Sequence, residues 1–134
     1  MKKICIILLG LMISLFTHAQ APQRLSYQAV VRDANSDLVV DQQVKLRLSI
    51  LISPTATNSI WQEVQTIRTN ENGLVSLQLG QVNSLPDNIF MNNGTLYLKT
   101  EVDPNGSGTY SISGTSQLLS VPYAMYSKDV QNKD

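Results

Sequence analysis

The sequence predicts an all-β protein, built as a single antiparallel β-sandwich of about seven strands. The first observation is that apolar and polar residues alternate along several stretches, which is the pattern of strands buried on one face. The second is that clusters of Asn, Asp, Gly and Pro separate these stretches, as expected where antiparallel strands reverse direction. The third is length: the chain has 134 residues, and the 115 that remain without an expected leader of 19 suffice for one domain and not two.

Residues 1–19 have the pattern of a signal peptide. Lys2 and Lys3 form a basic start, residues 4–16 are apolar, and Ala19 ends a short stretch suited to cleavage. The apolar run is shorter than the roughly 20 residues that a membrane span needs, and no later stretch approaches that length. Cys5 lies at the beginning of the apolar run, whereas a lipid-attachment cysteine belongs at its end. We therefore expect an exported chain, in the periplasm, at the cell surface or outside the cell, without a membrane span after cleavage.

Cleavage after Ala19 removes Cys5 and His18, the single Cys and the single His of the chain. Thiol nucleophiles, imidazole bases and soft-metal ligands are then absent from residues 20–134, so we expect neither an enzyme nor a cofactor. Without Lys2 and Lys3, eight Lys and Arg stand against ten Asp and Glu. No clustered basic surface of the kind that nucleic acid requires is visible in that pattern.

Three stretches carry the strand alternation most clearly. The residues expected to face the core are Leu25, Tyr27, Ala29 and Val31 in the first, Val44, Leu46, Leu48, Ile50 and Ile52 in the second, and Leu96, Leu98, Thr100 and Val102 in the third. The same alternation places Val30 and Leu51 on the outward face. Turn clusters follow or precede these strands at residues 33–37, 70–73 and 103–108.

Other parts of the chain follow the alternation less strictly. Residues 60–68 mix two phases, because Ile60 and Val64 share one while Trp61 and Ile67 share the other; this favours a bulged or edge strand. Residues 80–94 form a long connection, with one helical turn expected near residues 86–90. The sandwich is expected to span residues 20–121, and residues 122–134 to form a short helical or partly disordered tail.

Acidic and amide side chains suggest two chemistries that compete with ordinary structural roles. Glu101 with Asp103, or Glu63, could form a glycosidase pair, but charge pairing across a solvated strand face is the favoured interpretation. Two loops place oxygen-bearing side chains at alternating positions, as calcium-binding loops do. These residues are Asp33, Asn35 and Asp37 in one loop and Asp103, Asn105 and Ser107 in the other. Neither loop continues to the Gly and the distant Glu of the helical calcium loop, so hairpin-turn chemistry is favoured.

Apolar and aromatic residues suggest two kinds of contact surface. The C-terminal stretch "LLSVPYAMYS" carries Tyr123, Met125 and Tyr126, and Tyr123, Tyr126 and Val130 recur at helical spacing. These residues either close the sandwich or, with outward Leu51 and Val30, form an apolar patch that awaits another chain. Exposed Trp61 and Tyr97 would provide a stacking platform for glycans, whereas a lone Trp in a small sandwich is more often part of the core.

Several motifs resemble known modules. The stretch "VVRDANSDLVVDQQVKLRLSIL" followed by "TIRTNENGLVSLQLG" resembles the carboxypeptidase-regulatory, transthyretin-like sandwich, which has an immunoglobulin-like architecture and is commonly non-catalytic. The set "QAPQRLSYQAVVRDAN", "TNENGLVSLQLG", "YLKTEVDPNG" and "GTSQLLSVPYAMYSK" is similar to a module of secreted Bacteroidota proteins. That resemblance implies a place at the start of longer chains with tail-fibre-like or collagen-like surface regions.

This chain departs from that pattern at two points. Asn35-Ser36-Asp37 stands where an Asn-Gly turn is more usual, and no fibre-like region follows the tail in the sequence. The expectation from residues and resemblance together is a secreted, non-catalytic structural or protein-interaction module, with a protein partner or self-association. A glycan-binding or adhesive module using Trp61 and Tyr97 is the alternative.

Overall fold

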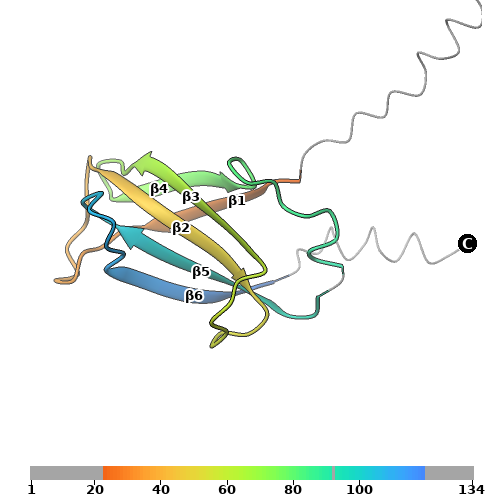
Figure 1. Ribbon diagram of the computed structural model, residues 1–134. Coiled ribbons are helices and arrows are strands. Elements are labelled where there is room, and N and C mark those ends of the chain that lie inside the picture. The colour runs from red at the N-terminus through yellow and green to blue at the C-terminus, as the bar shows by residue number, and fades with distance from the viewer. Residues whose placement is uncertain (1–22, 92, 120–134) are drawn as a thin grey trace, which may run out of the picture.

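A computed structural model describes residues 23–91 and 93–119. Within them the chain forms six β-strands and no α-helix (Figure 1). The strands are β1 (Leu25–Val30), β2 (Gln43–Leu51), β3 (Trp61–Arg68), β4 (Leu74–Leu79), β5 (Leu96–Asp103) and β6 (Ile112–Leu118). The all-β prediction is confirmed at this level, with six strands described where about seven were expected. The predicted signal peptide and the predicted helical tail lie outside the described residues.

The strands form two antiparallel sheets of unequal width. One sheet pairs β1 with β4, and the other has the order β3-β2-β5-β6. Figure 1 shows the narrow sheet lying across the wide one, with β3 and β6 at opposite edges of the wide sheet. Two packed antiparallel sheets are consistent with the predicted β-sandwich. No helix of the described residues has the length and apolarity to cross a membrane.

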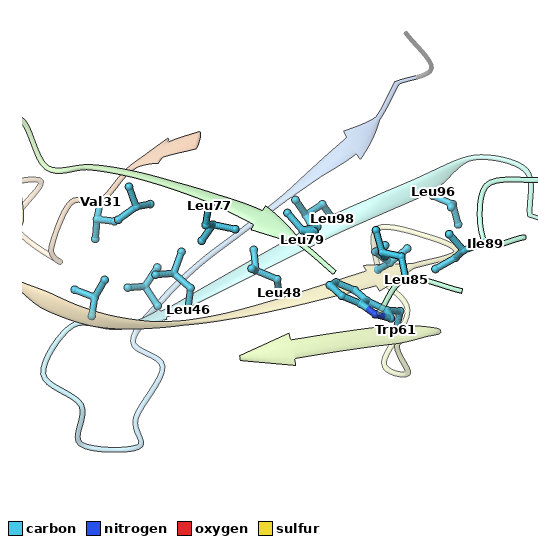
Figure 2. Packing of buried hydrophobic residues seen from close by; sticks show 14 of the residues in the cluster. Val31, Leu46, Leu48, Trp61, Leu77, Leu79, Leu85, Ile89, Leu96 and Leu98 are labelled. Atoms are coloured by element: carbon cyan, nitrogen blue, oxygen red, sulfur yellow. The ribbon is translucent and has the colours of Figure 1, made fainter. Parts of the chain in front are cut away.

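The core follows the predicted alternation closely. Val44, Leu46, Leu48 and Ile50 of β2 are all buried, and so are Leu96, Leu98 and Val102 of β5. Thr100 of β5, together with Leu25, Tyr27 and Ala29 of β1, is half-buried. Figure 2 shows Leu46 and Leu48 of β2 facing Leu77 and Leu79 of β4, with Val31 in the same layer as Leu77. Alternation is a local property of a strand, so the sequence predicts it well.

At the C-terminal end of β2, one residue differs from the prediction in its exposure and another in its facing. Leu51 lies on the outward face, as predicted, yet only 3% of it is exposed. Ala56, Thr57 and Ser59 of the connection to β3 line the same hollow as Leu51, so the connection covers the outer face there. Ile52 was expected in the core, but it lies just past the end of β2 and is exposed.

Strand β3 is an edge strand, as predicted, and its pairing with β2 contains no bulge. The register runs without interruption from Ile50 opposite Trp61 to Gln43 opposite Arg68. Trp61 and Ile67 face inward, and Val64 faces outward with 42% exposed. Glu63 and Gln65 alternate in step with Trp61 and Ile67, so these two polar side chains also point inward and are buried.

The connection between β4 and β5 contributes to the core. Leu85 and Ile89 are buried, and Ile89 N donates to Pro86 O at 3.1 Å, which forms a turn near the predicted position. Figure 2 shows both side chains at the same end of the core as Trp61. Gly80 enters this connection with φ 89°, and a Cβ there would lie 2.7 Å from Gln23 O, so the close approach requires glycine.

The turn after β1 contains a strained serine. Ser36 has φ 69°, a left-handed conformation that glycine adopts freely and other residues adopt at a cost of roughly 1–2 kcal/mol. The turn is held by Ser36 N, which donates to Asp33 O at 3.0 Å, and by Arg32 Nη1, which donates to Ser36 O at 2.9 Å. Ser36 is thus the position at which an Asn-Gly turn would place its glycine.

We predict that Ser36→Gly stabilises the protein by about 0.5–1 kcal/mol, because it removes the left-handed strain without removing a side-chain contact. Urea unfolding followed by circular dichroism measures the change. Ser26→Gly, at an exposed strand position, is the matched control and should destabilise by about 0.5–1 kcal/mol. Equal effects of the two substitutions would show that the strain at Ser36 is not significant.

Candidate functional site

The sandwich is closed along one side and open along the other. On the closed side, Gln65 Nε2 of β3 donates to Gln78 O of β4 at 2.8 Å, so side chains connect the two sheets. On the opposite side, β1 and β6 lie at the ends of their sheets, and each pairs with one strand only within the described residues. We call the hollow between them the open groove.

The open groove has a volume of about 200 Å³ and a mainly apolar surface. Its lining residues come from four strands and the residue after β1: Tyr27, Ala29, Val30, Val31, Leu46, Thr100, Val102, Ile112, Ser113 and Gly114. Val30 stands at its rim with 52% exposed, in agreement with the outward facing predicted for it. The groove therefore combines an apolar floor with an exposed apolar rim.

The groove exists because the narrow sheet does not cover β6. The inward positions of β6 are those opposite the inward residues of β5, with Gly114 opposite Thr100 and Ser116 opposite Leu98. Gly114 and Ser116 are nevertheless exposed, and a Cβ added at Gly114 would meet nothing within 4 Å. Within the part of the chain that the structure describes, no layer covers the inner face of β6, and small residues keep this face shallow.

The two sheets meet through one polar contact at the groove. Tyr27 Oη and Thr100 Oγ1 lie 2.9 Å apart and share a hydrogen bond. This bond satisfies both hydroxyls, so the groove has an apolar floor without an unpaired polar atom at that point. The strand edges beside the groove carry backbone N–H and C=O groups, and these groups can hydrogen-bond an added polypeptide.

A second hollow, which we call the outer pocket, lies on the outward face of the wide sheet. It measures about 180 Å³ and is mainly polar, lined by Arg47, Ser49, Leu51, Ala56, Thr57, Ser59, Gln62, Lys99 and Glu101. Tyr97 stands opposite Leu51 in the β2–β5 register, on the same face and beside this pocket, and is half-buried. Hydroxyl, amide and ammonium groups in this pocket can hydrogen-bond a small polar molecule.

Its strongest charges already bind each other. Arg47 and Glu101 form a two-point ion pair, with Nε–Oε2 at 2.7 Å and Nη2–Oε1 at 2.9 Å. The Tyr110 ring stacks on the Arg47 guanidinium at 4.1 Å, and Lys99 Nζ lies 3.2 Å from Glu101 Oε1. The hydrogen bond from Arg47, followed by that from Lys99, holds the pKa of Glu101 below its ordinary value against the opposing effect of burial.

The three carboxyl groups considered for catalysis are all engaged in structural contacts. Glu101 forms the cross-strand charge pairing that the sequence predicts. Asp103 and Glu63 were expected on the same solvated face, and this is wrong, because both are buried. Asp103 is covered by its own turn, and Glu63 lies on the inward phase of β3 with Trp61.

Glu63 fastens the chain that leaves β4. Its Oε1 accepts from Gly80 N at 3.1 Å and from Gln65 Nε2 at 2.7 Å, and its Oε2 accepts from Val82 N and Asn83 N, both at 3.1 Å. A carboxyl with four donors is well satisfied despite its burial. The sequence reasoning missed this role; the signal was the shared phase of Trp61 and Ile67, which carries Glu63 inward.

The two loops considered for calcium use their carboxylates on their own backbone. Asp33 Oδ1 accepts from Asn35 N at 2.8 Å and from Asp37 N at 3.0 Å. Asp103 likewise accepts from backbone N–H groups, the nearest being Gly108 N at 2.7 Å. These donors point at the oxygens that a cation would need, as in the hairpin turns that the sequence favours. Among residues 23–91 and 93–119, no three His, Cys, Asp or Glu side chains gather as a metal site.

The hydrogen bonds also set the acidity of Asp103. Burial alone would raise its pKa, but backbone N–H groups of Gly108, Ser107 and Asn105 together lower the pKa below its ordinary value. Asp103 has no solvent-accessible surface, and its carboxylate stabilises the turn between β5 and β6.

The glycan-binding alternative needs an exposed Trp61 beside Tyr97. Only 5% of Trp61 is accessible, and its Nε1 donates to Asn83 O at 3.1 Å and to Ser84 O at 3.2 Å. The connection after β4 covers the ring, which the sequence of β3 alone does not reveal. Tyr97 thus stands without Trp61 as a partner. The predicted tail residues Tyr123, Met125 and Tyr126 lie outside the described residues.

We predict that Glu63→Gln destabilises the protein by about 1–3 kcal/mol, because one carboxyl oxygen becomes an NH₂ group that faces backbone N–H donors. Urea unfolding followed by Trp61 fluorescence reports on the same connection. The control is Glu71→Gln, an exposed residue of the turn before β4, which should stay within about 0.5 kcal/mol of the parent. Similar values for both would contradict a structural role of Glu63.

We predict that acid weakens the fold through Glu101. Its folded-state pKa is lowered, so the ion pair with Arg47 contributes its full stability above the ordinary Glu pKa of about 4.3 and loses it as pH falls through the lower folded value. Urea midpoints measured from pH 7 to pH 2.5 should therefore fall less steeply at the acid end in Glu101→Gln than in the parent. Identical acid slopes would refute the contribution.

The comparisons with known proteins add a family. No curated protein matches the chain, and no solved structure matches it. Residues 26–117 match a family described as a domain of unknown function, DUF8740. The match runs from the second residue of β1 to the next-to-last residue of β6 and includes both hollows. Because it covers more than half of the sequence, the chain belongs to the DUF8740 family.

Proposed function

We propose that the protein is an exported, non-catalytic interaction module that binds an extended segment of another polypeptide along the open groove. The observation that carries the proposal is an apolar groove beside edges of β1 and β6 that no strand of residues 23–91 and 93–119 pairs with. An extended segment would add backbone hydrogen bonds at an edge and place alternate side chains in the groove.

The size of the groove supports a polypeptide ligand. Small-molecule pockets usually measure about 300–1,000 Å³, and the open groove, at about 200 Å³, is smaller. A strand needs room only for alternate side chains, because its backbone lies at the sheet edge. The outer pocket is less suited to binding, since Arg47 and Glu101 already neutralise each other there.

Residue chemistry supports the non-catalytic part of the proposal. Residues 20–134 contain neither Cys nor His, and Glu63, Glu101 and Asp103 each accept hydrogen bonds that hold the fold. A general acid or base needs to reach a substrate proton, and these groups are occupied. The signal-peptide pattern of residues 1–19 supports export.

The test is a photo-crosslinking amino acid placed at position 30 in the cells that produce the protein. We expect polypeptide adducts at position 30, at the groove rim, and none at position 64, a valine of similar exposure on the far edge strand β3. Mass spectrometry identifies the captured chain. Equal adducts at both positions, or no adduct at position 30, would refute binding at the open groove.

A further inference from the structure

Resting on the proposed function, we propose that the segment bound in the open groove is residues 119–126 of a second copy of this chain. The protein would then assemble head to tail, each copy offering its groove and contributing its C-terminal segment. The inference rests on where β6 ends, on the residues that follow it, and on the shape of the uncovered part of β6.

The direction of β6 separates the tail from its own groove. The groove is lined by the first three residues of β6, Ile112–Gly114, and the strand then runs on to Leu118. At about 3.3 Å per residue the strand ends roughly 13–20 Å from these three lining residues. The chain leaves the sheet with Leu119, which is exposed, and its course at that point leads away from the groove.

The sequence after β6 does not favour a reversal toward that groove. A tight hairpin needs residues such as Gly, Asn or Asp, which accept positive φ. Residues 118–126 contain none of them. Val121 precedes Pro122, and a residue before proline is biased toward extended backbone. A segment that continued in the direction of β6 would be available to the groove of another copy.

The same segment has the pattern of an added strand. Val121, Tyr123 and Met125 alternate with Pro122 and Ala124, so that three large apolar side chains share one face of an extended chain. In the register that turns the backbone groups of Val121 and Tyr123 toward β6, Pro122 faces away, where its missing N–H costs no ladder bond.

The uncovered part of β6 fits such side chains. Gly114 presents no side chain, and a Cβ built there meets nothing within 4 Å. Ile112 beside it is half-buried, and Val30 stands at the opposite rim. An aromatic ring such as that of Tyr123 can lie over a strand glycine and cover the backbone there. The groove thus lacks the bulk that the C-terminal segment supplies.

The arrangement is heterologous, because the groove of one copy binds the tail of the next. Such contacts produce closed rings or open filaments, depending on the rotation between neighbours. In an open filament, the copy at one end keeps an unoccupied groove and the copy at the other end keeps an unbound tail. Association should therefore depend on concentration and on both surfaces at once.

The test uses the absence of Cys from residues 20–134. Two single-cysteine chains are prepared, Ser113→Cys at the groove and Ala124→Cys in the tail, mixed, and treated with a short bismaleimide. We expect a heterodimeric adduct whose yield rises with concentration, alongside light-scattering masses above that of one chain. Replacing Ser113→Cys by Val64→Cys, on the far edge of the wide sheet, should abolish the adduct.

Two charge substitutions test the contact itself. Val30→Glu at the rim and Met125→Glu in the tail should each weaken association by on the order of tenfold or more, because a carboxylate would enter an apolar contact. Val64→Glu, a valine of similar exposure, should leave association unchanged. Circular dichroism checks that each variant keeps the β spectrum, and Met125→Glu tests the contact without altering a described strand.

The outcomes separate this inference from the proposed function. A chain carrying both Ser113→Cys and Ala124→Cys that cross-links only within itself, at every concentration, would show that the tail occupies its own groove and would overturn the inference. No cross-link at all would overturn it as well. Photo-adducts at position 30 with a different polypeptide would then still support strand binding at the groove, whereas their absence would refute the proposed function too.

Discussion

The fold depends on the buried polar contacts that close one side of the sandwich. Glu63, Gln65 and Trp61 of β3 hydrogen-bond the backbone of β4 and of the chain that follows it. These contacts hold the narrow sheet over β3 and β2, so a two-stranded layer cannot also reach β6. The open groove is thus the geometric consequence of closing the opposite side.

Closing a side with polar groups requires that every one of them find a partner, because a buried donor or acceptor left alone costs about 1–3 kcal/mol. Within residues 23–91 and 93–119, no buried side-chain nitrogen or oxygen lacks a hydrogen-bond partner. The directional bonds to Gly80, Val82 and Asn83 also fix the position of Leu85 and Trp61 in the core. Polar specificity and apolar packing therefore support each other at this end of the molecule.

The sequence predicts those features that depend on neighbouring residues along one strand. Alternation placed Val44 to Ile50 and Leu96 to Val102 correctly, because the two faces of a strand are set locally. It does not show that Leu51 and Trp61 are covered, because the connections over them follow a path that depends on distant contacts. It also placed Glu63 on a solvated face, although the phase of Trp61 and Ile67 was available as evidence. Local pattern gives the strands, and long-range packing decides which exposed positions stay exposed.

The open groove was beyond sequence reasoning for the same reason: it follows from the order of strands in two sheets and from the width of one of them. The apolar C-terminal stretch, by contrast, is plain in the sequence, where it raises the question of what covers it. A sheet face without a covering layer and an apolar stretch without an assigned place are complementary deficits in the same chain. Burying each is favourable by about 25 cal/mol per Å² of apolar surface, and the proposed contact would bury both while incurring the entropic cost of association only once.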